Sequence, residues 1–475
     1  MGNEHEMRFV GRQGDRLPIS RSWETTNAAG ERWTVYDFGA TYPLGEIRSE
    51  PGRANDPRGA EHSLDGTEWS AIPEPGPGEP IRLKSVHARY VRMEGAGAEF
   101  FAGVGFAAEP ADDWTRLFHR KQGWTGADGI YSIPLNGVEA PGRAARSRTL
   151  FLFGDTFVGE VDERTDARKG ATMINNSLAL LEGDRPSPAA VSFRWNREGE
   201  TPASAIMPRT PGGLAHGGTY YWLQDGTSVG GEFHCFPLII GPNPDGPEGF
   251  QFEVHGVARV SAPMGEDGPM LEQQEQEDTP LYFRSSGGLT TYFGAAIQPN
   301  TAEAGVPDPD GYVYVYGLQK DEDTNLVVAR VPADELARVE RWTFWNGSEW
   351  TPRKEECAPI AFGVSAELSV SPAPEGFAGG KYVLVTQLGG VSGHRVAVAA
   401  GESPIGPFEP SVPVYACPEP EQGHDVYTYN AKAHPHLSHP GELLASYNVN
   451  ATSMDALMAF GGIYRPKFIR IRQVV

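Results

Sequence analysis

The chain has 475 residues and a formal net charge of −22, with 62 acidic residues against 40 lysines and arginines. Phosphate groups would repel such a chain, so nucleic acid and anionic membrane surfaces are excluded as expected partners. The length exceeds one typical domain and predicts two domains, or one large repeat fold with an accessory module.

The composition predicts an all-β protein. The 58 glycines and 40 prolines make up roughly a fifth of the chain, which is typical of short strands joined by tight turns. Amphipathic helical patterns are few, and Pro332–Trp342 is the best of them. The three cysteines, Cys235, Cys357 and Cys417, are widely spaced and predict buried free thiols rather than a disulfide framework or a zinc site.

Two observations bear on location. The chain contains no run of about 20 apolar residues, so no membrane-spanning helix is expected. Residues 1–17 are charged and lack the apolar centre of a secretory signal, which predicts a cytoplasmic protein, with a secreted protein whose leader has been removed as the alternative.

Residues 1–108 form the first predicted domain, a β-sandwich. Its pieces are the alternating stretch Trp33–Gly39, the turn-rich stretch His62–Trp69, a Pro/Gly linker and the stretch His87–Gly95. This order resembles the discoidin-like β-sandwich of many carbohydrate-binding modules. The resemblance implies sugar binding through loops at one end, and a purely structural role remains the alternative.

Residues 109–475 form the second predicted domain, in which short strands recur in five groups. Strand groups that recur regularly and are bounded by Gly and aromatic residues favour blades repeated around one axis, and therefore a five-bladed β-propeller. A pair of plain β-sandwiches is the alternative. In a propeller the first strand of each blade lines the central channel, so residues distant in sequence converge on one axial pocket.

The second domain is organised around Gly123–Gly159. The run Thr149–Phe153 predicts a buried strand that ends at Gly154, which would place Asp155 at a rim or cleft. Asp128 lies between Gly126 and Gly129, where the backbone turns sharply and can approach a ligand. Two such carboxyl groups are what a glycosidase needs as acid and base. Asp in a Gly-rich loop also commonly caps its own turn.

Further candidates come from other predicted blades. Glu367 is expected in a strand among small and apolar residues, where a carboxylate faces either the channel or an exposed edge. The amides of Asn175 and Asn176 suit sugar hydroxyl groups or a turn cap. Trp124, like Trp222, suits stacking on a sugar face or a place in the core.

Glu232, Asn430 and His434 complete the predicted substrate-binding set. His434 precedes Pro435 and so could point into the axial pocket and tune a carboxylate, or be buried and satisfied by the backbone. The histidines near residues 424–439 do not have the spacing of a zinc motif. No cofactor is expected, although a structural cation such as calcium in the axial channel is compatible with the sequence.

Five stretches carry a resemblance to the five-bladed propeller glycosidases, most closely to uncharacterised bacterial domains related to endo-D-arabinanases. They are Gly126–Ser132, Leu150–Phe157, Gly311–Gly317, Val327–Pro332 and Ser403–Phe408. In those relatives an Asp in the opening Asp-Gly segment and the Asp of Phe-Gly-Asp-Thr line the central cleft. The resemblance therefore implies that Asp128 and Asp155 are the catalytic carboxyl groups.

The sequence thus predicts a glycoside hydrolase that cleaves an arabinofuranose- or fructofuranose-type furanoside by an inverting route. Asp128 and Asp155 are the expected acid and base, and Glu367 is a third carboxylate. One alternative is a phosphorylase or transglycosidase, which would need Arg, Lys and His near the pocket. Another is a carbohydrate-binding propeller without activity, and a lyase on acidic polysaccharide fits the acidic chain less well.

Overall fold

The structure is a computed structural model with two compact units. The first unit comprises Met1–Pro110, Val412–Pro418 and Ile469–Val475, and the second comprises Ala111–Ser411 and Glu419–Phe468. The residues that the structure describes are 10, 12–26, 30–49, 58–75, 79–95, 97–209, 213–246, 251–374, 377, 381–390, 393–423 and 425–475.

The first unit is built from antiparallel strands. Its longest strand, β2, pairs with β1, β5 and β6, and β7 pairs with β34. The apolar side chains of these strands, such as Phe38, Ile47 and Phe100, are buried together in one core. The strands are β1 (Arg21–Thr26), β2 (Arg32–Ser49), β3 (Arg58–Ser63), β4 (Ser70–Ala71), β5 (Ile81–Glu94), β6 (Ala98–Ala102), β7 (Gly105–Pro110), β31 (Val412–Ala416) and β34 (Lys467–Val474).

The second unit opens with a sheet in which β9 (Arg148–Val161) is central. It pairs with β8 (Gln122–Pro134), β10 (Arg168–Ile174) and β11 (Ser177–Glu182), and β11 pairs with β12 (Val191–Arg194). The expected strand end at Gly154 is wrong, because β9 continues through Asp155 to Val161. Residues of β9 on both sides of Gly154 pair with the neighbouring strands, and this pairing holds the extension.

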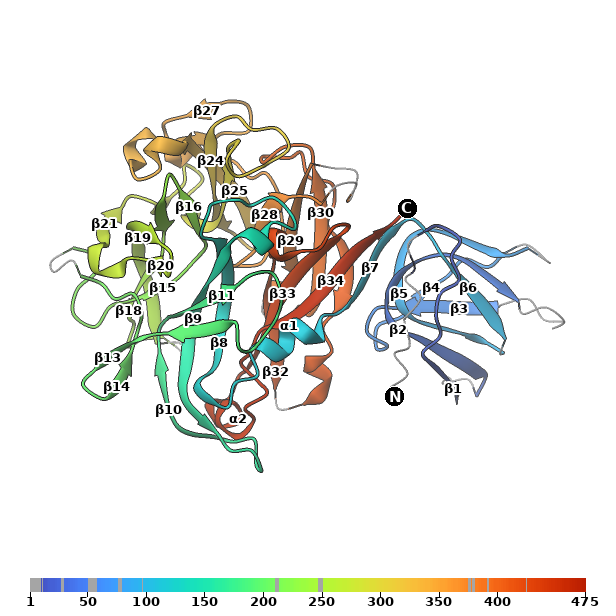
Figure 1. The fold of residues 1–475 in the computed structure, drawn as a ribbon. Coiled ribbons are helices and arrows are strands. Elements are labelled where there is room, and N and C mark those ends of the chain that lie inside the picture. The colour runs from blue at the N-terminus through green and yellow to red at the C-terminus, as the bar shows by residue number, and fades with distance from the viewer. Residues whose placement is uncertain are drawn as a thin grey trace. The chain divides into compact units, whose positions relative to one another are not determined.

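The remaining strands of the second unit form antiparallel sheets that follow one another along the chain (Figure 1). A two-stranded ribbon joins β13 (Asn196–Glu198) and β14 (Thr201–Ala203). The second sheet contains β15 (Tyr220–Trp222), β16 (Gly226–Val229), β17 (Glu232–Cys235), β18 (Leu238–Pro242), β19 (Phe252–Gly265), β20 (Gly268–Pro269) and β21 (Glu275–Thr279). The third contains β22 (Tyr282–Arg284), β23 (Thr290–Asn300), β24 (Tyr312–Lys320), β25 (Thr324–Pro332), β26 (Thr343–Trp345) and β27 (Trp350–Thr351). Further pairs join β28 (Ser369–Pro372), β29 (Tyr382–Leu388) and β30 (Arg395–Gly401), and join β32 (Val426–Ala433) with β33 (Glu442–Ala451).

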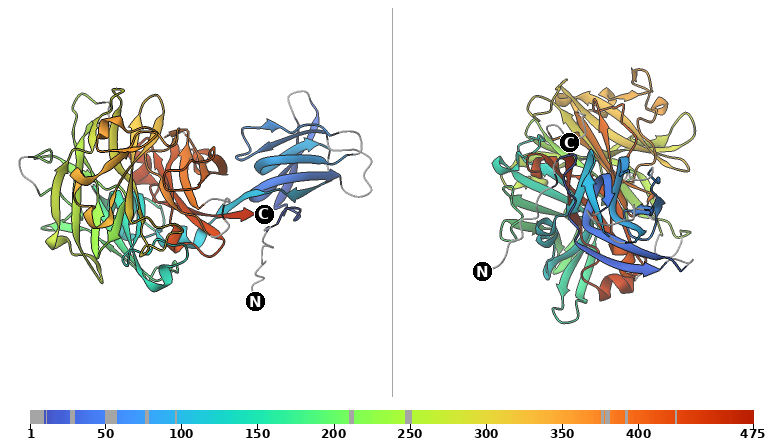
Figure 2. Two further views of the ribbon diagram at one scale, coloured as in Figure 1. Left: turned by 90° about the horizontal axis from the view of Figure 1, so that it is seen from above. Right: turned by 90° about the vertical axis from the view of Figure 1, so that its right-hand side faces the viewer.

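One strand of each sheet contacts its counterparts in the neighbouring sheets. β16 contacts β8 and β23, β23 contacts β28, and β28 contacts β32. β33, the partner of β32, contacts β8 and so closes the circle. These contacts make the second unit propeller-like, and the predicted all-β class is confirmed (Figure 2). The strands that meet in this way carry the residues described below.

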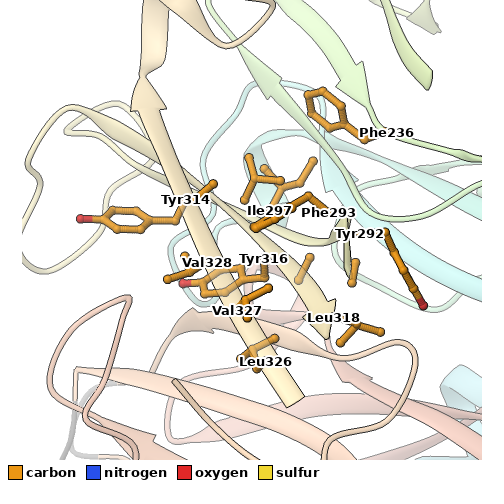
Figure 3. Packing of buried hydrophobic residues seen from close by; sticks show 14 of the residues in the cluster. Phe236, Tyr292, Phe293, Ile297, Tyr314, Tyr316, Leu318, Leu326, Val327 and Val328 are labelled. Carbon is orange, nitrogen blue, oxygen red and sulfur yellow. The ribbon is translucent and has the colours of Figure 1, made fainter. Parts of the chain in front are cut away.

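The largest apolar core lies between the sheets rather than inside one of them. It joins Phe236, which follows β17, to Phe293 and Tyr316 of the third sheet (Figure 3). Leu384 of β29 belongs to the same core. Every side chain in this group is buried, and burial of such side chains contributes about 1.5 to 3 kcal/mol each. The inner strands are therefore held on a rigid base.

The helices among the described residues are short. The α-helices are α1 (Asp112–Leu117) and α2 (Met454–Ala459), and the 3₁₀ helices are Ala144–Arg146, Leu271–Gln273, Ala333–Glu335, Val339–Arg341, Lys354–Glu356, Glu419–Gln422 and Pro435–Leu437. Among the described residues, no helix has the length and apolar character required to cross a membrane.

The predicted α-helix at Pro332–Trp342 is wrong, because two 3₁₀ turns separated by Leu336–Arg338 replace it. A segment this short needs packing to stay helical. Here Leu336 and Trp342 are buried, and the Trp342 indole N–H donates to the Leu336 carbonyl at 3.2 Å. The prediction of buried free cysteines is confirmed at all three positions.

Candidate active site

Asp128 and Asp155 lie on the paired strands β8 and β9. The pairing of these strands shifts register three times between Trp124 and Tyr131, which marks β-bulges around Asp128. A Cβ atom at Gly154 would collide with the Asp128 carboxyl oxygen Oδ1. The carboxyl group of Asp128 therefore packs directly on the backbone of the residue before Asp155, and Gly154 makes this approach sterically allowed.

Two tyrosines bond the Asp128 carboxyl group. The hydroxyl groups of Tyr429 and Tyr464 donate to Oδ2 at 2.8 and 3.1 Å. Burial raises the pKa of Asp128 to about 8, and the charges of Asp155 and Glu367 act in the same direction. The two hydroxyl donors oppose this rise because they favour the ionised form. At neutral pH Asp128 is thus mainly protonated and can donate a proton.

Asp155 is held by two other donors. The Trp222 indole N–H and the Asn175 amide donate to its Oδ1 at 3.1 and 3.4 Å. Burial raises the pKa of Asp155 to about 6, and the two hydrogen bonds limit the rise. Asp155 is therefore mostly ionised at neutral pH, whereas Asp128 is not.

Glu367 joins this group through a buried lysine. Lys432, whose side chain is 1% exposed, forms an ion pair with Glu367 Oε2. The Lys432 ammonium also donates to the Gly129 carbonyl at 2.8 Å, next to Asp128. Asn430 Oδ1 accepts from the Glu367 backbone N–H at 3.2 Å. Glu367 lies two residues before β28, so the expectation that it sits within a strand is wrong, and this loop lets the side chain reach Lys432.

The sequence reasoning missed one carboxylate, Asp225. Its two oxygens accept from the backbone N–H groups of Gly226 and Ile297, each at 2.8 Å. Burial raises the pKa of Asp225 to about 7, Lys432 lowers it and Glu367 raises it. Asp225-Gly226 stands at the start of β16 as Asp128-Gly129 stands in β8, and this repeated Asp-Gly was the signal that could have found it.

Unusual backbone conformations accompany these side chains. Ile130, Asn430 and Tyr464 have φ angles of 69°, 61° and 64°, in the left-handed region that side chains other than glycine rarely adopt. The pairing of β32 with β33 also shifts between Tyr429 and Lys432. Such conformations persist where the surrounding structure imposes them, as it commonly does at functional sites.

Three predicted substrate contacts need correction, because the side chains are buried. Trp124 is 1% exposed and packs on Phe153 and Phe193 at ring-centroid distances of 5.2 and 4.8 Å. Asn176, with no exposed surface, bonds the backbone of Ile206 through both its amide oxygen and its amide nitrogen. Both of these side chains belong to the core.

His434 is the third buried residue. Its two ring nitrogens lie 2.7 and 2.8 Å from the hydroxyl groups of Ser132 and Ser446, and burial lowers its pKa well below the ordinary value. It is a satisfied neutral histidine that ties β32 to β8 and β33. Asn430 is also buried and positions Glu367 instead of contacting a ligand. Glu232 is 56% exposed on β17, 3.5 Å from His234, and the structure does not bring it to the carboxyl groups above.

The group contains the kinds of side chain that an acid and base pair requires. Burial raises the pKa of both Asp128 and Asp155, and an ion pair of Glu367 with Lys432 stands beside them. Within the described ranges, no group of three or more His, Cys, Asp or Glu side chains is arranged to hold a metal ion.

Comparisons with known proteins place the chain by its fold and family. No curated protein matches it. A structure described as a "putative hydrolase" from Bacteroides ovatus ATCC 8483 is 18% identical, with a TM-score of 0.57 over 77% of this chain and 90% of that chain. A thermostable family-43 glycoside hydrolase is 14% identical, with a TM-score of 0.36 over 73% and 91%. Trypanosoma rangeli sialidase in complex with the inhibitor DANA is 10% identical, with a TM-score of 0.34 over 77% and 59%.

The likeness to the Bacteroides ovatus structure shows a shared fold. A family model matches most of the chain, residues 111–474, and its description is Domain of unknown function (DUF5005). The chain belongs to this family.

Proposed function

We propose that this protein is a glycoside hydrolase, with Asp128 as the general acid and Asp155 as the general base. The observation that supports it most is that two carboxyl groups lie on adjacent strands and that each is held by its own pair of hydrogen-bond donors. Hydrolysis of a glycoside needs one protonated carboxyl group for the leaving oxygen and one ionised group for water. Burial and the charges of Asp155 and Glu367 favour the proton on Asp128.

Glu367 acts in this proposal through charge. Its carboxylate raises the pKa of Asp128, and Lys432 fixes its position by the buried ion pair. Trp222 and Asn175 orient Asp155, since both donate to the same oxygen. They are positioning residues, because they act through Asp155.

The substrate that we propose is a furanoside of arabinofuranose or fructofuranose type, cleaved with inversion. This choice rests on the resemblance of the stretches around Asp128 and Asp155 to propeller glycosidases. Inversion requires Asp155 to activate a water molecule rather than attack the sugar. The anomeric form of the first product, followed by proton NMR, tests it, and a product of retained configuration contradicts it.

We further infer that the second unit has five blades and that the first unit is a discoidin-like β-sandwich. The contacts among β8, β16, β23, β28 and β32 support five inner strands, each at the start of one blade. For the first unit the support is the pairing of β2 with β5 and β6.

The test is product release from p-nitrophenyl furanosides and pyranosides and from arabinan and fructan oligosaccharides, with and without phosphate. Wild type is compared with Asp128→Asn and Asp155→Asn, and melting curves monitor the fold. Cleavage of a furanoside that falls by about 10² to 10⁴ in both variants supports the proposal. Activity retained in both variants contradicts it.

Two rivals have distinct outcomes in the same assay. A phosphorylase would need a cation free to bind phosphate; Lys432 is paired with Glu367, so Arg209, which lines a cavity with Asn175, is the candidate. Turnover that depends on phosphate would favour the phosphorylase. A sugar-binding propeller without activity would bind an oligosaccharide and cleave none of the panel.

A further inference from the structure

A cavity of about 490 Å³ is lined in part by Asn175, whose side-chain amide bonds Asp155. Its walls come from three segments: Asn175 after β10, residues between Ser204 and Arg209 after β14, and residues between Ala215 and Tyr220 before β15. A cavity of this size is within the range of small-molecule binding sites. None of its lining residues was assigned to substrate binding except Asn175.

Asn175 and Tyr220 connect this pocket to the candidate active site. The Asn175 backbone N–H donates to Ser204 Oγ at 3.0 Å, while its side-chain amide donates to Asp155. The charge of Asp155, together with burial as the larger cause, raises the pKa of Tyr220 to about 12. The Tyr220 ring also lies edge-on to Trp222 at a centroid distance of 6.2 Å, and Trp222 bonds Asp155. The pocket therefore lies next to the residues that bond Asp155.

The pocket differs in charge from the rest of the molecule. Acidic residues outnumber basic ones by 62 to 40 in the chain, yet none of the described residues that line the pocket is Asp or Glu, and they include Arg209 and His216. The Arg209 side chain is exposed, and within the described structure its guanidinium makes no hydrogen bond or ion pair with a side chain. An unpaired guanidinium is suited to two parallel hydrogen bonds with a carboxylate or phosphate.

The remaining lining suits a sugar ring. Met207, Pro208 and Tyr220 offer apolar and aromatic surface, and Ser204 and Thr219 add hydroxyl groups. An aromatic ring beside a few polar groups is the usual composition of a site for a small polar ligand. The lining therefore combines a stacking surface with a single strong anion-binding group.

We propose that this pocket is the subsite for the sugar unit next to the one cleaved, and that this unit carries an anionic group bound by Arg209. The inference rests on the proposed glycosidase function of Asp128 and Asp155. It narrows the substrate to an oligosaccharide with a carboxylate, as in a uronic acid, or with a phosphate ester. The neutral unit at the carboxyl groups remains the one whose bond is broken.

The test measures binding separately from cleavage. Calorimetric titrations of full-length Asp128→Asn protein compare disaccharides and trisaccharides of pentose and hexose type in three forms: neutral, terminated by a uronic acid, and phosphorylated. We expect one anionic form to bind about ten-fold or more tightly than its neutral counterpart, since charge-assisted hydrogen bonds are strong. The uronic acid and phosphate arms identify which anion is recognised.

Substitution of Arg209 assigns the preference to the pocket. In Arg209→Gln, on the Asp128→Asn background, the preference should disappear, and Arg209→Lys should restore only part of it because lysine lacks the two-pronged geometry. Arg197→Gln removes the same charge from an exposed strand, where Arg197 bonds the Glu200 carbonyl, and should leave the preference intact.

Three results overturn the proposal: equal affinity for neutral and anionic forms, a preference that survives Arg209→Gln, or no binding by any anionic sugar. Failure of the glycosidase proposal is a different result. In that case wild type cleaves nothing, while the anionic preference and its loss in Arg209→Gln are still measured.

Discussion

The assignment of Asp128 as the acid predicts how one tyrosine hydroxyl affects the pH profile. Tyr429 donates a hydrogen bond to Asp128 Oδ2, and this bond lowers the pKa of that carboxyl group. In Tyr429→Phe the ring remains and the donor is lost, so the ionised form of Asp128 loses stabilisation. Asp128 should then hold its proton to a higher pH.

The size of the effect follows from the hydrogen bond. A bond to a charged group contributes about 1.5 to 3 kcal/mol, and one pKa unit corresponds to about 1.4 kcal/mol. Removal of the donor should raise the pKa of Asp128 by about 1 to 2. Tyr464 still donates at 3.1 Å, which places the expected change near the lower end.

The assay is kcat/KM between pH 4 and pH 11. Wild type should rise through the pKa of Asp155, about 6, and fall through that of Asp128, about 8. In Tyr429→Phe the falling limb should move up to about pH 9, and the rising limb should stay. The maximum should decrease slightly, because a weaker acid protonates the leaving group less readily.

The control is Tyr427→Phe. Its ring stacks near that of Tyr429 at a centroid distance of 5.5 Å, but within the described structure its hydroxyl does not bond Asp128. In this variant both limbs of the pH profile of kcat/KM should stay at their wild-type pH. If the falling limb stays in place in both Tyr429→Phe and Tyr464→Phe, or moves down, then Asp128 is not the acid. The carboxyl ¹³C shift of Asp128, followed with pH, gives the same answer for a variant without turnover.

Three further perturbations follow from the same contacts. Gly154→Ala should push the Asp128 carboxyl group out of place and reduce kcat/KM by about 100-fold. The control is Gly287→Ala, whose Cβ would meet only Ser285 Oγ at 3.8 Å and which should keep its activity. Equal activity in the two variants refutes the close approach of the Asp128 carboxyl group to Gly154. Lys432→Met leaves Glu367 without its buried cation and should lower the free energy of unfolding in urea at pH 7 by about 3 to 5 kcal/mol; a loss below about 1 kcal/mol would argue against the buried pair. The pKa of Asp225 in the folded protein is raised to about 7, so its contribution to stability is complete below pH 3.8 and is lost as the pH rises through 7. Asp225→Asn should therefore flatten the dependence of the free energy of unfolding on pH between pH 3.8 and pH 7. An unchanged slope of that dependence contradicts the raised pKa.

The parts of the fold that depend on local pattern were predictable from the sequence. The short apolar run Thr149–Phe153, bounded by turns, predicted a buried strand, and β9 contains it. The family resemblance implied that Asp128 and Asp155 line one cleft, and the two lie on paired strands. The local pattern could not show that β9 continues past Gly154, since glycine usually marks a turn and here instead makes room for a carboxyl group.

The errors at the site share one physical cause. Trp124, Asn176 and His434 are polar or amphipathic side chains in segments close to Asp128 and Asp155, and nothing local distinguishes a ligand-facing position from a satisfied buried one. A shift of one residue in register turns every side chain to the other face of a strand. The bulges in β8 and β32 impose such shifts, and their positions depend on tertiary contacts.

The residues that the sequence did not assign are those that act through another residue. Tyr464 reaches Asp128 from a loop 336 positions away, and Lys432 reaches Glu367 from 65 positions away. Their roles exist only when the inner strands meet, because an ordinary tyrosine and lysine acquire function from their partners. The repeated Asp-Gly of Asp225 was different, since a comparison of Asp128-Gly129 with Asp225-Gly226 reveals it.

The arrangement explains why the site tolerates buried charge. Asp128, Asp155, Asp225 and Glu367 bring four carboxyl groups to one region, and Lys432 is the buried cation among them. Full ionisation of the group would be costly because the carboxyl groups are partly buried and close together, so protons are retained where burial is greatest and like charges are closest. A proton on Asp128 is thus favoured by crowding as well as by burial. The proposed catalytic acid needs this property, because a group that keeps its proton in the resting protein can deliver it when a leaving oxygen develops negative charge.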